Sequence, residues 1–198
     1  NDPTNNLFWR FDMRRLTAEE MRDSMLAVTG ELNPQMGGPS FFPALQPAVL
    51  ATSSKGAGMW GRSSEDQRRR RSIYVTIKRS LKPPALQDFD FADTDAPCAV
   101  RFVTTTPTQA LNMLNGPLTN EKAVALAQRL SSESNGDESA FIRRGVELVT
   151  NRPATEWDIE RGRQLLRSLR TEHRLTGDEA RERFCLLLLN LNEFVYID

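Results

Sequence analysis

The chain has 198 residues, 39% of them hydrophobic and 26% charged, and its 26 basic side chains balance 26 acidic ones. This size and composition fit a globular domain with a real core, while zero net charge excludes a global field that would attract nucleic acid or a membrane surface. The longest strongly apolar run, residues 186–189, is far shorter than the roughly 20 residues that cross a bilayer, so we expect no membrane span.

The first helix is predicted by its capping residues. Thr17 and Glu20 have the spacing of a capping box, in which each side chain bonds the other residue's backbone N–H at a helix start. Apolar residues recur at one-turn spacing from Met21 onward, and Gly30 is a typical helix end. We therefore expect residues 1–30 to hold one amphipathic helix.

Residues 31–105 are expected to be largely irregular. Prolines, glycines and serines interrupt any periodic pattern up to about residue 61, and such a long irregular stretch is uncommon inside a compact domain. Its aromatic residues suggest that it wraps around another part of the protein: Phe41, Phe42 and Trp60. Farther on, Ile73, Val75 and Ile77 alternate with polar residues, which predicts a half-buried strand near residues 72–79.

Residues 106–198 are expected to form a helical bundle. Thr106, Pro107 and Gln109 supply an N-cap, a proline at the first helical position and a capping-box partner. Four further helix starts are indicated, at Thr119, Asp137, Thr155 with Asp158, and Asp178. Short connections between such helices favour antiparallel neighbours. The sequence therefore predicts a mainly α fold, a single domain over residues 1–198 with one or two short β-strands.

One histidine and two cysteines leave little room for chemistry that depends on these residue types. His173 alone cannot build a His-based zinc cluster or a bis-histidine haem site, and its place near a helix end favours a solvated side chain. Cys98 and Cys185 are too far apart for a Cys-x-x-Cys motif. Two separate buried thiols are the plainer interpretation, and one disulfide is the alternative in an exported protein. No catalytic, cofactor or metal residue is indicated.

A run of four arginines is the sharpest charge feature: Arg68, Arg69, Arg70 and Arg71. Guanidinium groups match the oxygens of phosphate and sulfate groups on a polyanion, so the run is a candidate anion-binding site, for example for an anionic polysaccharide. The alternative is that these arginines pair with a partner domain or with an acidic loop that contains Asp88, Asp90, Asp93 and Asp95. Nucleic-acid binding through the run is the weakest of the three hypotheses.

The same four aspartates raise calcium as a ligand, because hard cations prefer several carboxylate oxygens. Their spacing differs from that of an EF-hand loop. No glycine stands at the turn position, and no glutamate closes the loop. A solvated acidic loop is therefore the favoured interpretation.

Short strings along the chain, each weak by itself, match a known family in the same order. They are Asp2-Pro3, Trp9-Arg10, Arg14-Arg15-Leu16-Thr17, Arg22-Asp23-Ser24, Met36-Gly37-Gly38-Pro39-Ser40, Arg71-Ser72-Ile73-Tyr74, Phe89-Asp90, Thr104-Thr105-Thr106-Pro107, Arg152-Pro153, and Leu189-Asn190 with the residues up to Asp198. This ordered set resembles the carboxy-terminal part of the planctomycete secreted domain family, one of the numbered domains of unknown function.

The resemblance implies context instead of chemistry. Domains of this family usually follow another uncharacterised domain, and often a c-type cytochrome domain, in exported proteins of planctomycetes and related bacteria. It implies a periplasmic or cell-envelope location and a chain that begins partway into the family domain, and it carries over no catalytic residues.

We therefore expect a non-catalytic scaffold or interaction module that contacts upstream domains of the same polypeptide. The competing hypothesis is an enzyme or polysaccharide-binding site that upstream residues complete, with the arginine run holding an anionic substrate.

Overall fold

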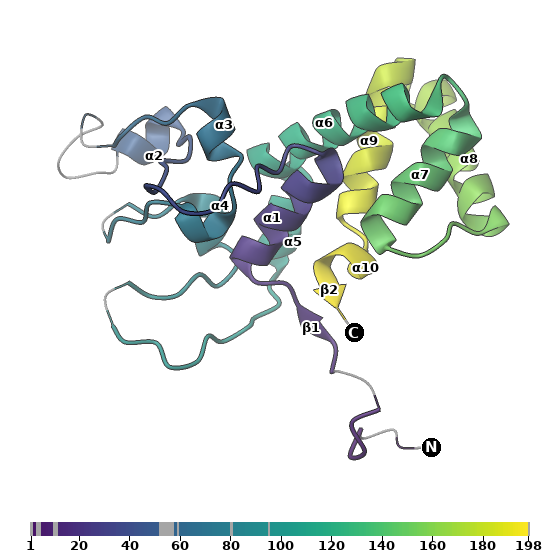
Figure 1. The fold of residues 1–198 in the computed structure, drawn as a ribbon. Coiled ribbons are helices and arrows are strands. Elements are labelled where there is room, and N and C mark those ends of the chain that lie inside the picture. Colours follow the sequence, from purple (N-terminus) through teal and green to yellow (C-terminus); the bar gives the residue numbers. More distant parts are fainter. Residues whose placement is uncertain are drawn as a thin grey trace. The chain divides into compact units, whose positions relative to one another are not determined.

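The structure, a computed structural model, describes residues 2, 5–9, 12–51, 58, 60–79, 81–94 and 96–197. It confirms the mainly α fold, because helices predominate and the described residues contain one short two-stranded sheet. The chain divides into two compact units, whose elements are labelled in Figure 1. We call them the α1 unit (Thr17–Lys122) and the bundle unit (Asn1–Leu16 with Ala123–Asp198).

The α1 unit begins with the helix that its capping box predicts. Helix α1 spans Ala18–Thr29, and the side chains of Thr17 and Glu20 each accept a hydrogen bond from the other residue's backbone N–H. Gly30 ends the helix with a φ of 76°, a left-handed conformation that glycine adopts without strain. The predicted inward face is confirmed by two buried residues, Met21 and Met25.

The described part of residues 31–105 is largely irregular, as expected, and contains short helical segments. These are α2 (Pro47–Ala51), α3 (Glu65–Arg68), the 3-10 turn η2 (Ser72–Tyr74) and α4 (Pro84–Gln87). Helix α5 (Pro107–Asn115) follows, with the capping box of Thr106 and Gln109 that the sequence predicts. The helix ends at Gly116, which is its C-cap.

The strand predicted near residues 72–79 is wrong. Ser72–Tyr74 forms a 3-10 turn, and beyond it the backbone makes isolated bridges, Phe41 with Val75 and Lys78 with Leu81. Ile73, expected on a buried face, is 76% exposed. The cause is tertiary, because side chains of α1 hold the backbone at Ser72 in a tight turn. Contacts of this kind override the strand preference of an alternating sequence.

Three helices form the core of the bundle unit, α7 (Glu138–Thr150), α8 (Glu156–Thr171) and α9 (Gly177–Leu189). Helix α7 packs against both of the others (Figure 1). Fully buried side chains fill the space between them, among them Phe141, Ile142, Ile159, Leu166, Cys185 and Leu189. The sequence-based expectation of a helical bundle in this half of the chain is therefore confirmed.

The helix starts of the bundle unit follow the predicted caps with two corrections. Asp137 caps α7, and Thr155 with Asp158 forms the capping box of α8, as expected. Helix α6 (Pro117–Ser134), which continues from the α1 unit, starts at its proline instead of at Thr119. Helix α9 is capped by Thr176, which forms a capping box with Glu179, instead of by Asp178. Asp178 lies in the first turn, where its negative charge interacts favourably with the helix dipole.

A two-stranded antiparallel sheet joins the two ends of the bundle unit. Strand β1 (Arg14–Arg15) pairs with β2 (Tyr196–Ile197), which follows the short helix α10 (Asn192–Val195). The backbone N–H of Leu16 extends the pairing with a hydrogen bond of 2.8 Å to the carbonyl of Val195. Among the described residues, no helix has the length and apolar character to span a membrane.

Gly162 marks a close approach between α8 and α7. A Cβ atom at this position would lie 2.6 Å from Cγ2 of Ile142, well inside contact distance, and Ile142 is fully buried. By contrast, a Cβ at Gly177 would meet no atom within 4 Å.

We predict that Gly162→Ala lowers the free energy of unfolding by about 1–3 kcal/mol, because overpacking outweighs the better helix propensity of alanine. Gly177→Ala is the matched control and should leave stability unchanged or raise it by up to about 1 kcal/mol. Urea unfolding followed by circular dichroism measures both. A neutral or stabilising Gly162→Ala would contradict the close packing.

Asp158 links the start of α8 to the preceding turn. Its two carboxylate oxygens accept hydrogen bonds of 2.8 and 3.1 Å from Arg152, and one of them also accepts from the backbone N–H and the hydroxyl of Thr155. The hydrogen bonds from Arg152, followed by those from Thr155, hold the pKa of Asp158 well below its ordinary value, although burial acts the other way.

A carboxylate with a lowered folded-state pKa stabilises the fold above its unfolded pKa of about 3.9, and this contribution is lost as the pH falls further. Asp158→Asn should therefore cost about 1–2 kcal/mol at pH 7 and much less at pH 2.5. The exposed Asp178→Asn serves as control, with a smaller effect at pH 7. Urea unfolding at both pH values tests this, and an equal loss at both would refute the ionic role of Asp158.

Candidate functional site

The arginine run lies against α1, and Arg22 of that helix holds its backbone. Arg22 Nη1 donates to the carbonyl of Arg70 at 3.0 Å and to the hydroxyl of Ser72 at 3.1 Å, and Nη2 donates to the carbonyl of Arg68. Burial lowers the pKa of Arg22, an effect that its neighbour Asp23 partly opposes. A buried guanidinium needs such acceptors, because leaving it without them is costly.

Asp23 fixes the same backbone from its other side. Its carboxylate accepts hydrogen bonds from the N–H of Ser72 at 2.8 Å and from the Ser72 hydroxyl at 2.7 Å. It also forms an ion pair of 3.8 Å with Arg71, whose side chain is 57% exposed. Arg22 and Asp23 together impose the turn at Ser72 that replaces the predicted strand.

Arg70 is the most buried member of the run, with 4% of its surface exposed. Its guanidinium donates to the carbonyls of Pro39 (2.8 Å) and Gly37, and it lies 3.9 Å from the ring centroid of Tyr74. The hydroxyl of Tyr74 in turn accepts a 2.7 Å hydrogen bond from the N–H of Gly37. Arg70 therefore holds the irregular segment around Gly37 and Pro39 in place.

Arg69 belongs to a network of alternating charges. It forms ion pairs with Glu31 at 3.1 Å and with Glu65 at 2.5 Å, and Lys122 reaches Glu31 at 2.8 Å. Burial raises the pKa of Glu31, but the hydrogen bond from Lys122, with the charges of Lys122 and Arg69, lowers it more strongly. Both cations are therefore engaged within the α1 unit.

Arg68 differs from the rest of the run. Among the described residues its side chain has no hydrogen-bond or ion-pair partner, although the buried Nε without an acceptor is a feature that it shares with Arg70. The sequence analysis treated the four arginines alike, as one candidate anion-binding site. The structure divides them into three that make internal contacts and one that does not, and whether an anion binds there stays a prediction.

Among the described residues, the aspartates of the acidic loop do not pair with the arginine run. Asp90 accepts hydrogen bonds from the N–H and hydroxyl of Thr104 and from the side chain of Gln109, while Asp93 pairs with Lys82 at 3.4 Å and Asp88 accepts from Asn112. This part of the pairing hypothesis is therefore wrong, and Asp95 lies outside the described residues. Within the described part of the chain, no three acidic, histidine or cysteine side chains are grouped as metal ligands.

A pocket of about 540 Å³, the Trp60 pocket, lies within the α1 unit beside Arg68. Its aromatic wall is formed by Phe42 and Trp60, whose rings meet edge to face with centroids 5.4 Å apart. Arg62 and Arg68 line it as well. In the sequence, Trp60 was noted only as an aromatic residue of a wrapping loop. Its place in the same pocket as Arg68 depends on tertiary structure.

Two anchors define the shape of the long segment between α4 and α5. At one, Asp90 binds Thr104 as described above. At the other, Arg101 Nη1 lies 2.8 Å from both carboxylate oxygens of Glu19, and its guanidinium is 5.2 Å from the ring centroid of Phe91. We call residues 96–106 the Phe102 segment, because Phe102 is 84% exposed at its surface, near the exposed Val100 and Val103.

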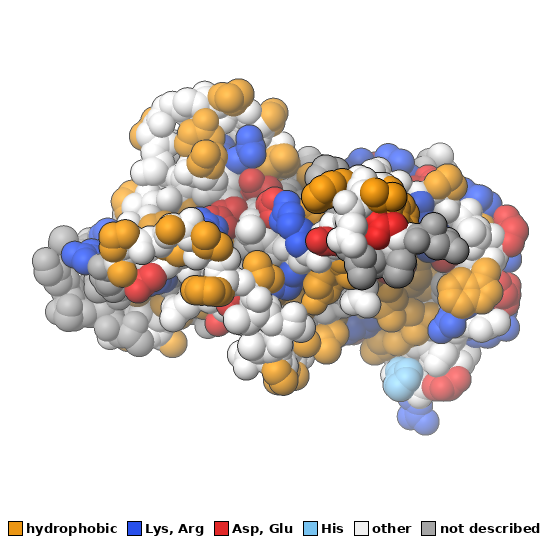
Figure 2. Space-filling model, turned by 90° about the horizontal axis from the view of Figure 1, so that it is seen from below, with side chains coloured by type: hydrophobic (Ala, Val, Ile, Leu, Met, Phe, Trp, Pro, Cys, Tyr) orange, Lys and Arg blue, Asp and Glu red, His pale blue; other side chains and the backbone are white. Residues whose placement is uncertain are grey.

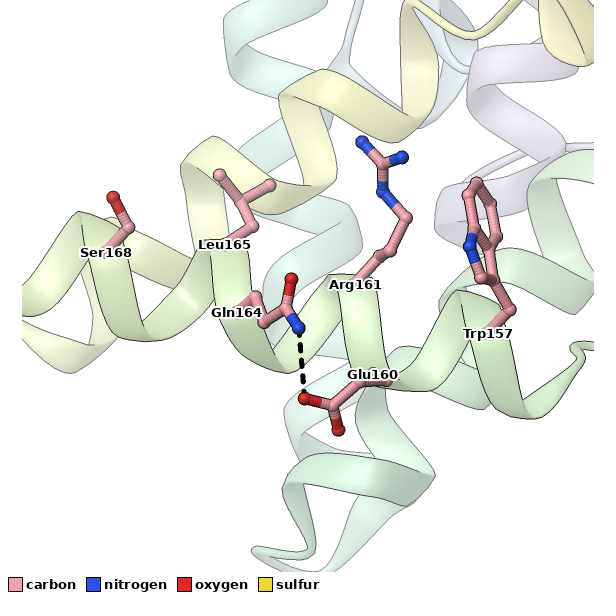
Figure 3. A pocket seen from close by; sticks show the side chains of 6 residues that line it. All are labelled: Trp157, Glu160, Arg161, Gln164, Leu165 and Ser168. Atoms are coloured by element: carbon pink, nitrogen blue, oxygen red, sulfur yellow. Dashed lines mark hydrogen bonds between the residues drawn. The ribbon is translucent and has the colours of Figure 1, made fainter.

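A second exposed surface lies on α8 of the bundle unit. Figure 3 shows its side chains along one side of a single helix, where they border an open hollow of about 500 Å³. Trp157 is 63% exposed, the guanidinium of Arg161 lies 4.7 Å from its ring, and Gln164 donates to Glu160 at 3.2 Å. All lining residues come from one helix, so the hollow is a shallow surface feature.

The cysteines and the histidine lie in three different places, Cys98 in the Phe102 segment, Cys185 in α9 and His173 just after α8. Both cysteines are free thiols, Cys185 buried in α9 and Cys98 exposed, so the expectation of two buried thiols is wrong for Cys98. Burial raises the pKa of Cys185 far above its ordinary value, which keeps it a neutral thiol. His173 is exposed, as expected, and is the pale blue side chain in Figure 2.

Comparison with known proteins places the chain beside one family. The family model described as "PSD1: Protein of unknown function (DUF1553)" matches residues 1–166. The strings from Leu189 onward that contributed to the resemblance lie beyond this match. Comparison with curated proteins and with solved structures gives no match.

We predict that Arg70→Leu lowers the free energy of unfolding by about 2–4 kcal/mol, because the carbonyls of Gly37 and Pro39 lose a charged donor. Arg71→Leu removes the same charge from an exposed position and should cost less than about 1 kcal/mol. Chemical denaturation followed by circular dichroism compares the two. Equal losses would show that Arg70 does not hold the irregular segment.

Proposed function

The chain belongs to the PSD1 family of proteins of unknown function, and we propose that it is a non-catalytic interaction module of a larger exported, cytochrome-associated bacterial protein. Its partners are upstream domains of the same polypeptide, among them a c-type cytochrome domain, in the periplasm or cell envelope. Export and cytochrome association rest on the family resemblance of the sequence. The interaction role rests on the surface of the α1 unit.

The Phe102 segment is the observation that carries the proposal. It has no helix or strand, yet Asp90 and Arg101 anchor it at separate points, and it presents Phe102 and Val100 (72% exposed) to solvent. Long loops held in this way usually serve a function. A preformed apolar surface binds with a smaller entropic cost than a disordered one, because its backbone is already ordered.

The polar side chains of the unit support a structural use of its charges. Arg22, Asp23 and Arg70 bind backbone groups, and Asp90 binds the hydroxyl of Thr104. Each is engaged in holding an irregular segment in place, which is the work that a binding scaffold requires. Figure 2 shows hydrophobic side chains exposed at several places on one face of the protein, and such surfaces are typical of contact with a partner.

We predict that Phe102→Ser weakens binding of this chain to the upstream part of the polypeptide by about tenfold or more, because burial of a phenylalanine contributes roughly 1.5–3 kcal/mol. Ile73→Ser is the matched control, since Ile73 is 76% exposed but lies outside the segment. It should change the dissociation constant by less than about twofold. Isothermal titration calorimetry of this chain against the separately produced upstream part measures the dissociation constant for the unchanged chain and for both variants.

Two outcomes would refute the proposal. One is the absence of any association between the two parts, and the other is an equal loss of affinity in both variants. Circular dichroism of each variant checks that the α1 unit keeps its helices. A turnover assay on the recombined parts addresses the alternative of a shared active site, which predicts activity only when both parts are present.

A further inference from the structure

The Trp60 pocket is positively charged. Arg62 and Arg68 line it, and none of its described lining residues is acidic. Lys78 adds to the positive potential, with its Nζ 5.6 Å from the ring centroid of Trp60 and 5.8 Å from that of Phe42. In a chain with zero net charge, this local excess of cations around an aromatic wall is a specific feature of the site.

Both lining arginines are available to a ligand. Among the described residues, the side chains of Arg62 and Arg68 have no hydrogen-bond or ion-pair partner. The Arg68 side chain is partly exposed where it lines the pocket and has no protein acceptor among the described residues, and its Nε is buried without one, as is that of Arg70. An oxyanion supplies such acceptors and forms the strong, charge-assisted hydrogen bonds that a guanidinium favours.

The aromatic wall of the pocket is preformed. Trp60 Nε1 donates to the carbonyl of Pro43 at 2.9 Å, and the N–H of Phe42 donates to the hydroxyl of Ser63 at 3.0 Å. Gly61 permits this arrangement, because a Cβ there would lie 2.4 Å from the ring of Phe42. With a volume of about 540 Å³, the pocket falls in the range of small-molecule sites, roughly 300–1,000 Å³.

We propose that the Trp60 pocket binds a carboxylate or sulfate that is carried on a six-membered ring. Arg68, assisted by Arg62, binds the oxyanion, and the ring lies against Trp60 and Phe42. The ring can belong to an acidic sugar or to an aromatic acid, which share this chemistry. The site uses one member of the arginine run together with Arg62, instead of the four consecutive arginines, and it does not depend on the interaction role proposed above.

The test is a titration of the 198-residue chain with glucuronate, benzoate and neutral glucose, followed by the NMR resonance of the Trp60 indole N–H. Trp60→Phe assigns that resonance. We expect saturable shifts with at least one of the two acids, and binding of glucose at least about tenfold weaker, because glucose lacks the oxyanion. Tighter binding of glucuronate than of benzoate supports an acidic sugar, and the reverse supports an aromatic acid.

Matched variants locate the site. Arg68→Gln should weaken binding of the preferred acid by about tenfold or more, whereas Arg71→Gln, which removes the same charge outside the pocket, should change it by less than about twofold. Should Arg68→Gln fail to fold by circular dichroism, the exposed Arg62→Gln provides the second variant, with an expected loss of about threefold or more. No saturable shift with either acid, or equal losses in the pocket and control variants, would overturn the proposal.

Discussion

The arrangement of the α1 unit depends on one buried interaction, the contact of Arg22 with the backbone of the arginine run. The carbonyls of Arg68 and Arg70 lie at the end of α3, where carbonyl groups lack partners within the helix. Arg22 supplies donors to these carbonyls, and they supply the acceptors that its guanidinium needs away from water. The guanidinium and the two carbonyls therefore satisfy each other's hydrogen bonds, and neither group is left unpaired away from water.

This contact determines the environments of four consecutive arginines. With the backbone of Arg68 and Arg70 held against α1, Arg70 is turned toward the loop at Gly37, while Arg68 lines the Trp60 pocket. A run of like charges would repel itself if all four side chains shared one surface. The four side chains instead contact carbonyls, carboxylates and the lining of a pocket, and this separation lowers the repulsion. Arg68 is the member of the run that lines the Trp60 pocket.

Polar side chains hold the irregular segments of the α1 unit in place, in addition to the buried apolar side chains of Phe41, Leu81 and Phe89. Arg70 and Tyr74 hold the segment at Gly37, and Asp90 holds the Phe102 segment. Asp90 itself has a φ of 60°, a left-handed conformation that aspartate tolerates better than most residues. Anchored irregular backbone can present apolar side chains without a helix or strand, which suits a module whose role is contact with other domains.

Local capping chemistry made the helices predictable from sequence. A capping box is complete within four residues, so Thr17 with Glu20 and Thr106 with Gln109 identify helix starts without knowledge of the rest of the fold. Where two signals competed, as at Pro117 against Thr119, the boundary moved by two residues. The mainly α class and the helical bundle followed from the same local signals and from hydrophobic spacing.

The sequence by itself determined the longer helices, most of their starts and the presence of a strongly basic run. Only the tertiary structure decided that Ser72–Tyr74 forms a turn, because the hydrogen bonds that Ser72 donates to the Asp23 carboxylate join residues 49 positions apart. The different environments of the arginines in the run also depend on tertiary structure. Arg68 and Arg70 are identical in type and two residues apart. The contacts of Arg70 with Gly37, Pro39 and Tyr74, which no local pattern encodes, distinguish it from Arg68, whose side chain has no partner among the described residues.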